Sequence, residues 1–208
     1  MMSVIGNWAL RKAFSDASMW QADGVELPVS VNLSSAQLKL ADLSQVIERA
    51  LADFNLDPSL VCLEISESTA MHDTQYTTSV LSELKALGVR LALDDFGTSY
   101  SSLAYLSAMP VNRLKIDKRF IDDLSLNNSA KTVIDAIVGL GQGLGLEIVA
   151  EGVEHEVQQR LLNEAGCDIA QGYLYAEPLA REDMLAFVGG RSLKIKDNIL
   201  PFPPKVLN

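Results

Sequence analysis

Two adjacent carboxylates, Asp94 and Asp95, follow the apolar run Leu91-Ala92-Leu93 in the segment LALDDFG (91–97). Like charges at the end of an apolar strand repel each other and resist transfer out of water. A bound divalent cation would offset both costs. In a regular strand the two side chains point to opposite faces. We therefore expect a distorted strand end, which Gly97 permits, to bring both carboxylates to one pair of ions.

Polar side chains also stand near the ends of the other predicted strands. They are Asn32, Glu64, Lys115, Asp117, Glu151 and Gln171, with Glu67 and Glu154 close by in the sequence. Carboxylate and amide oxygens form a hard ligand set that suits Mg²⁺ or Mn²⁺. Two such ions about 4 Å apart are a common apparatus for phosphodiester hydrolysis. The pattern therefore predicts a two-metal site.

Each of these residues also has a simpler explanation when it is taken alone. Asp95 could cap a helix or a turn, and Lys115 could be a surface lysine on an edge strand. Glu67 and Glu154 could be solvated loop residues, and Gln171 a hydrogen-bonded core amide. Recurrence of polar residues at the ends of six consecutive strands favours the metal site.

Short aliphatic runs alternate with longer amphipathic stretches along the chain. The runs predict strands over 28–34, 61–67, 90–96, 112–117, 147–153 and 169–175. The stretches predict helices over 3–22, 35–54, 75–88, 99–109, 129–145 and 155–166. The glycine-rich segment 139–145 lacks the spacing of a dinucleotide-binding loop and fits a helix C-terminus. We expect Trp8, Phe14 and Trp20 of the first helix to lie in the core.

Repeated strand–helix units indicate an α/β protein with a mostly parallel sheet, either doubly wound or closed into a barrel. The polar residues of the first four strands share one parity, whereas their aliphatic neighbours take the other. One parity can face outer helices while the other faces a shared interior that ends in polar groups. This pattern favours a TIM-type (β/α) barrel. Six strands and an initial helix indicate that the barrel is incomplete, with its first strands missing.

The composition limits the classes of partner. The chain has 208 residues, 48% of them hydrophobic, which suits one domain, and a formal net charge of -10. This charge argues against binding to DNA or RNA polymers or to anionic lipid, and an anionic ligand would need local cations. Cys62 and Cys167 are expected to be free thiols, as in a cytoplasmic protein. The N-terminus predicts neither a signal peptide nor a membrane span.

Six sequence blocks resemble, in order, the signature blocks of the EAL-type cyclic-di-GMP phosphodiesterases. They are VNLSSAQL, LEISES, LALDDFGTSYSSLAYL, LKIDKRF, VAEGVEHEVQ and GCDIAQGYLYAEPL, between about residues 4 and 188. The resemblance implies a modified TIM barrel over residues 1–188, followed by a tail over 189–208. It also implies a signalling hydrolase that converts cyclic-di-GMP to linear pGpG with two Mg²⁺ or Mn²⁺ ions.

The resemblance also assigns roles to individual residues. Asn32, Glu64 and Asp94 would bind the first metal, and Asp94 would bridge to a second metal that Asp95 also binds. Glu151 corresponds to the general base. Lys115 would hold the attacking water or a phosphate oxygen. Asp117 would support Lys115, Glu67 would brace the loop after Asp95, and Glu154 and Gln171 would complete the surroundings of the site.

Four departures from the family pattern weigh against full activity. The chain contains no Glu-Ala-Leu motif, whose glutamate binds the first metal in the family, and it lacks the nearby substrate-binding arginine. Ser99 replaces the second glycine of the loop after Asp95, and Glu177 replaces a basic residue. Two alternatives therefore stand beside an enzyme of reduced activity: an inactive EAL-like binding module, and a fragment of a larger signalling protein.

The strand that carries Asn32 would form an exposed edge if the first strands are missing. We expect a symmetric partner chain to cover this edge in a homodimer. The alternative is the tail, in which SLKIKDNIL (192–200) could form one strand. Pro201, Pro203 and Pro204 favour a loose tail instead.

Overall fold

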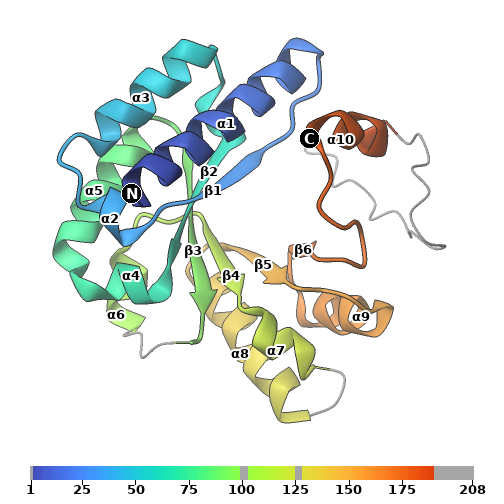
Figure 1. Cartoon of the computed structure of the whole chain (residues 1–208). Helices are drawn as coiled ribbons and strands as arrows, with labels where there is room; N and C mark the ends of the chain where they lie inside the picture. Colours follow the sequence, from blue (N-terminus) through green and yellow to red (C-terminus); the bar gives the residue numbers. More distant parts are fainter. Residues whose placement is uncertain (1, 99–102, 125–127, 190–208) are drawn as a thin grey trace.

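The computed structural model describes residues 2–98, 103–124 and 128–189 (Figure 1). Its centre is one six-stranded sheet in which all neighbouring strands are parallel. The strands are β1 (Val29–Asn32), β2 (Val61–Ser66), β3 (Arg90–Phe96), β4 (Arg113–Ile116), β5 (Glu147–Glu151) and β6 (Ile169–Gln171). Each strand lies inside a segment for which the sequence predicts one.

The order of the strands decides between the two α/β architectures. The order is β1-β2-β3-β4-β5-β6, so every strand pairs with its neighbour in the sequence. A doubly wound sheet would reverse direction at a switch point, and this sheet does not. The sheet curls, with helices along its outer side (Figure 1). The fold is an incomplete TIM-type barrel, as the sequence predicts.

Helices connect consecutive strands and cover the outer face of the sheet, and one further helix stands near each end of the described chain. They are α1 (Met2–Ala22), α2 (Ser35–Leu38), α3 (Leu43–Phe54), α4 (Glu67–His72), α5 (Thr74–Ala86), α6 (Leu103–Ala108), α7 (Lys118–Asp122), α8 (Asn128–Gly143), α9 (Glu156–Ala165) and α10 (Arg181–Val188). One short 3₁₀ turn, Pro58–Leu60, precedes β2. The glycine-rich segment ends α8, as expected, and Gly145 follows with φ +70.

Helices α4, α7 and α10 were not expected, and one expected helix is divided. The expected helix over 35–54 is divided into α2, which begins after a capping box between Ser34 and Gln37, and α3, which begins at Leu43. Helices α4 and α7 are one or two turns long, and the side chains of Ser66 and Asp117 cap their N-termini. Elements this short leave little hydrophobic periodicity in a sequence.

The core lies between the sheet and its helices. Leu63, Leu91 and Leu114 are completely buried on the helix-facing side of three adjacent strands. In α1, Phe14 and Trp20 are buried as predicted. The prediction is wrong for Trp8, which is 67% exposed. Trp8 lies two residues before Leu10, so it faces away from the buried stripe of this helix.

The first and last helices of the described chain, α1 and α10, contact each other. The indole Nε1 of Trp20 in α1 donates a hydrogen bond to the carbonyl oxygen of Arg181 at the start of α10, at 3.3 Å. Among the described residues, β1 pairs only with β2, so its other edge is free. Residues 192–200, the candidate tail strand, lie outside the described residues. No helix in the described part of the chain is long and apolar enough to cross a membrane.

Candidate metal centre

Lys115 lies at the centre of the predicted site. It comes from β4 and is only 4% exposed. Its Nζ lies 2.5 Å from Glu64 Oε2, 3.2 Å from Asp94 Oδ1 and 2.5 Å from Glu151 Oε1. The three carboxylates come from β2, β3 and β5, so four adjacent strands direct charged side chains to one place. Lys115 is therefore a buried ion-pairing residue and not a surface lysine.

The end of β3 is distorted where Asp94 and Asp95 lie. Leu93 pairs with Leu114 and Phe96 with Ile116, so two residues of β3 stand opposite the single residue Lys115. Asp95 has a left-handed backbone with φ 56, and its N–H donates to Asp94 Oδ1 at 2.9 Å. The expected distortion is thus present, although Asp95 itself takes the unusual conformation and Gly97, with φ 93, follows it.

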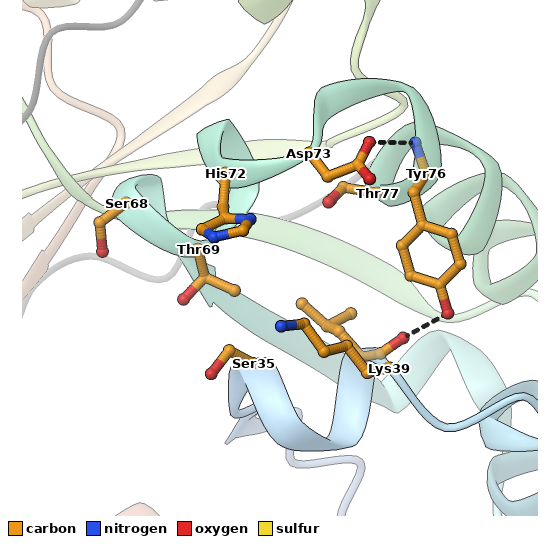
Figure 2. Close-up of a pocket in the computed structure, with 9 residues that line it drawn as sticks. Ser35, Lys39, Ser68, Thr69, His72, Asp73, Tyr76 and Thr77 are labelled. Carbon is orange, nitrogen blue, oxygen red and sulfur yellow. Dashed lines mark hydrogen bonds between the residues drawn. The ribbon is translucent and has the colours of Figure 1, made fainter.

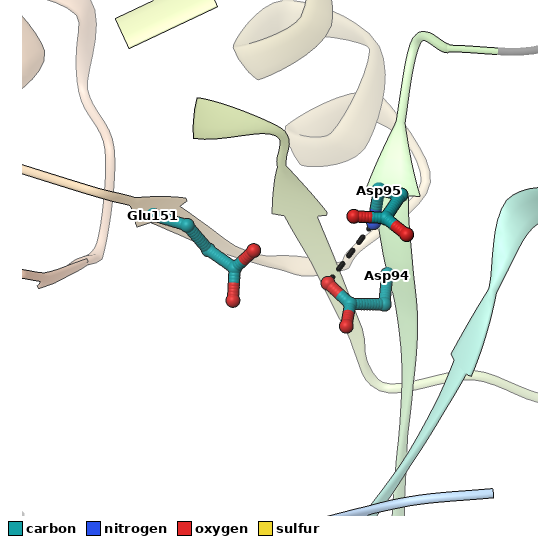
Figure 3. Close-up of side chains that lie close together, drawn as sticks. All are labelled: Asp94, Asp95 and Glu151. Atoms are coloured by element: carbon teal, nitrogen blue, oxygen red, sulfur yellow. Dashed lines mark hydrogen bonds between the residues drawn. The ribbon is translucent and has the colours of Figure 1, made fainter. Parts of the chain in front are cut away.

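This bulge brings both aspartates to Glu151. One oxygen from each of Asp94, Asp95 and Glu151 lies within 4.8 Å of the others. Figure 3 shows the carboxylate of Glu151 reaching from β5 toward the two aspartates of β3. A non-glycine residue in the left-handed region costs about 1–2 kcal/mol. Such strain persists where the surrounding structure over-determines it, which is common at functional sites.

Burial and the nearby charges shift the pKa values of these groups. Burial raises the pKa of Glu151, Lys115 opposes this shift, and the charges of Asp94 and Glu64 add to it. Burial also raises the pKa of Asp95, with Asp94 as the next contributor. Burial disfavours the charged form of Lys115, but its hydrogen bonds to Glu151 and Glu64 outweigh this and raise its pKa. The site therefore has an excess of negative charge.

Glu67 connects the end of β2 to the loop after Asp95. It is the first residue of α4 and is 1% exposed. Its Oε2 accepts hydrogen bonds from the backbone N–H groups of Gly97, at 3.0 Å, and Thr98, at 3.1 Å. This buried carboxylate holds the backbone immediately after the bulge. Ser99, which replaces the family's glycine, lies outside the described residues.

The remaining predicted residues lie around this cluster. Asn32 stands opposite Glu64 in the β1–β2 pairing, and Gln171 stands opposite Glu151 in the β5–β6 pairing; both are exposed. Asp117 caps α7 and accepts a hydrogen bond from the Arg119 backbone at 2.8 Å. Glu154 forms an ion pair with Lys118 at the surface.

The structure adds two cations that sequence reasoning did not select. Arg119 Nε lies 3.0 Å from Asp117 Oδ1, and the pKa of Asp117 is lowered because its hydrogen bonds to Arg119 outweigh burial. Lys118 pairs with Glu154. Both follow β4 in LKIDKRF, and only their position next to Asp117 marks them in the sequence.

Comparison with known proteins identifies the family. The family model described as EAL domain matches residues 1–178. The chain belongs to the EAL domain family. Proteins of this family are metal-dependent, and Asp94, Asp95 and Glu151 supply an acidic cluster of the kind that a metal requires.

Its relatives include known signalling proteins. The EAL chain is 40% identical over 184 residues to the signaling protein YkoW of Bacillus subtilis. It is 43% identical over 185 residues to MucR of Pseudomonas aeruginosa, a bifunctional diguanylate cyclase/cyclic di-GMP phosphodiesterase. Each match covers 88% of this chain but only 23% of YkoW and 27% of MucR. The chain thus spans about a quarter of the length of these curated relatives.

A solved structure supports the same assignment. The EAL chain resembles the PaMucR phosphodiesterase in its c-di-GMP complex with a TM-score of 0.85 and 41% sequence identity. The match covers 88% of this chain and 74% of that one.

Proposed function

We propose that this chain is a phosphodiesterase domain that hydrolyses cyclic-di-GMP to linear pGpG with two divalent cations, Mg²⁺ or Mn²⁺. The observation that carries the proposal is the convergence of Asp94, Asp95 and Glu151 on one place beside Lys115. The family membership and the similarity to a phosphodiesterase with bound c-di-GMP support the choice of substrate.

The donor set fits hard cations. Asn32, Glu64 and Asp94 are assigned to the first ion, and Asp94 and Asp95 to the second. All of these ligands are oxygen atoms, as Mg²⁺ and Mn²⁺ prefer. Several carboxylates face one lysine, so added positive charge would relieve their repulsion. When bound, the ions would lower the pKa of a water molecule and neutralise charge on the leaving oxygen.

The chain's own residues then have separate roles. Glu151 accepts a proton from the attacking water, and its raised pKa suits a general base near neutral pH. Lys115 orients this water or a phosphate oxygen from its position 2.5 Å from Glu151. The water oxygen bonds to phosphorus, one ribose oxygen leaves with its electron pair and takes up a proton, and the ring opens.

Other residues hold the site in place. Glu67 braces the loop after Asp95 through its two backbone hydrogen bonds. We assign Asp117, Glu154 and Gln171 to the rim, where they would position Lys115 and the substrate. The same proposal places residues 1–188 in the EAL domain, residues 189–208 in a tail, and the protein in the cytoplasm.

The decisive experiment measures pGpG formation by the purified chain at saturating Mn²⁺ or Mg²⁺. Glu151→Gln should lower kcat by roughly 10²- to 10⁴-fold, because it removes the general base. Glu164→Gln, which changes an exposed glutamate of α9, should leave kcat unchanged. A variant as active as the unchanged chain would contradict the role of Glu151.

The same assay separates the enzyme from the alternative function. An unchanged chain that binds cyclic-di-GMP in calorimetry but forms no pGpG would be a binding module. Ser99 and Glu177, at which the sequence departs from the family pattern, favour this second candidate. Such a result would contradict the proposed hydrolysis.

A further inference from the structure

A cavity of about 320 Å³ lies between α2 and the pair α4 and α5, and none of the metal-centre residues lines it (Figure 2). Its polar lining includes Ser35, Lys39, Ser68, Thr69 and His72. Ligand pockets begin at about 300 Å³, so this cavity can hold a small organic molecule.

Two basic side chains enter this cavity. Figure 2 shows the Lys39 amine and the His72 ring directed into the space between α2 and α4. Neither side chain has an ion pair among the residues that the structure describes. In a protein of net charge -10, two basic side chains without acidic partners favour an anionic ligand.

Hydroxyl groups complete the set of donors. Ser66 Oγ donates to Thr69 Oγ1 at 2.9 Å, so the Thr69 O–H remains available to donate elsewhere. Ser35 adds a second hydroxyl to the lining, whereas the Ser68 hydroxyl lies 3.3 Å from Ser66 Oγ and donates to it. An ammonium, an imidazole and two hydroxyls match the several acceptor oxygens of a phosphate group.

One acid also lines the cavity, but it has another role. Asp73 caps α5, and its Oδ1 accepts a hydrogen bond from the backbone N–H of Tyr76 at 3.1 Å. Leu38 and Tyr76 line the same cavity. The Tyr76 hydroxyl donates to the Leu38 carbonyl at 3.1 Å, which holds the ring in place. These two residues offer apolar surface to the organic part of a ligand.

We propose that this cavity binds a small phosphomonoester, with its phosphate group on Lys39 and His72 and its organic part toward Leu38 and Tyr76. Inorganic phosphate shares the anionic chemistry but would leave much of the cavity empty. The proposal is independent of phosphodiester hydrolysis at the metal centre.

The two histidines of the chain allow a direct test. His72 lines the cavity, whereas His155 is the N-cap residue of α9, which lies between β5 and β6 in the chain and apart from α4 in Figure 1. The metal-free protein, labelled with ¹³C-histidine, is titrated with glycerol 3-phosphate and separately with inorganic phosphate at constant ionic strength. The imidazole resonances are followed by NMR. Lys39→Met is compared with Lys85→Met, which removes an exposed lysine from α5.

We expect the His72 resonances to shift saturably while those of His155 stay in place. Lys39→Met should weaken binding by roughly tenfold or more, because it removes a charge-assisted hydrogen bond. Lys85→Met should bind as the unchanged chain does. Tighter binding of glycerol 3-phosphate supports the phosphomonoester, whereas equal binding would overturn the role of Leu38 and Tyr76. Equal shifts of the His72 and His155 resonances, or no shift of either, would refute the site. Binding by Lys39→Met that is as tight as that of the unchanged chain would also refute it, provided that the His155 signal is unchanged.

Discussion

Lys115 carries a positive charge into a group of buried carboxylates. Replacing it with methionine keeps much of the side-chain volume but leaves Glu64 and Glu151 without their cation at 2.5 Å. We expect Lys115→Met to lower the free energy of unfolding by about 3 kcal/mol without metal, because breaking a buried ion pair costs roughly 3–5 kcal/mol. Urea unfolding with a chelator measures this change. Lys85→Met should change it by less than about 0.5 kcal/mol, and similar losses in both variants would contradict the role of Lys115.

Asp95 should be destabilising in the metal-free protein when it is ionised. Its folded-state pKa is raised, so its charge reduces the free energy of unfolding as the pH rises from about 4 toward neutrality. Asp95→Asn removes this charge and tolerates a left-handed backbone. We expect Asn to add about 0.5 kcal/mol at pH 7, a small gain because solvent screens this exposed group. Thermal unfolding should show that the stability gain of Asp95→Asn disappears below pH 4. An equal gain at pH 7 and below pH 4 would contradict an electrostatic cause.

Helix α4 supports the bulged end of β3 through its first residue. Glu67→Ala removes both hydrogen bonds to the backbone of Gly97 and Thr98 and leaves two donors without this partner. We expect a loss of about 2 kcal/mol in the free energy of unfolding, because one charged acceptor is removed. Denaturant unfolding measures the loss, and Glu48→Ala, at an exposed position of α3, is the control. In Glu67→Ala, the backbone amide of Gly97 should also exchange its hydrogen faster than in the unchanged chain. Unchanged exchange at this amide would argue against a bracing role for Glu67.

At the scale of the whole molecule, the edge of β1 that faces away from β2 pairs with no other strand among the described residues. We expect a second copy of the chain to cover it, because an exposed edge readily pairs with another strand. Light scattering should give twice the mass of one chain. Successive backbone N–H groups along a strand point alternately to its two edges. The N–H of Leu33, which follows β1, donates to the carbonyl oxygen of Glu64 in β2, so the N–H of Ser30 points to the open edge. Ser30→Pro should therefore yield a folded monomer, and Ser30→Ala a dimer; a monomeric unchanged chain would exclude this interface.

Local sequence patterns were sufficient for the strand–helix alternation and for selecting polar residues that the structure brings together at the candidate site. Strand β3 coincides with the predicted segment 90–96, because an apolar run between turns depends mainly on neighbouring residues. Glu64, Lys115 and Glu151, which the structure brings together, stand out in the sequence because each stands late in its strand. Helices α4 and α7 were missed because one or two turns carry little periodicity. Trp8 was assigned to the wrong face because aromatic character alone does not show which side of a helix is buried.

The sequence by itself determined which residues bring oxygen and charge to the carboxyl ends of parallel strands, since that follows from alternation along each strand. Only the tertiary structure decided how they meet. The strand order makes the sheet an incomplete barrel, and the bulge turns Asp95 toward Asp94 and Glu151. Contacts such as Lys115 with Glu64 and Glu67 with Gly97 join residues 30 or more positions apart. Their distances depend on strand register and helix packing, which no single stretch of sequence specifies.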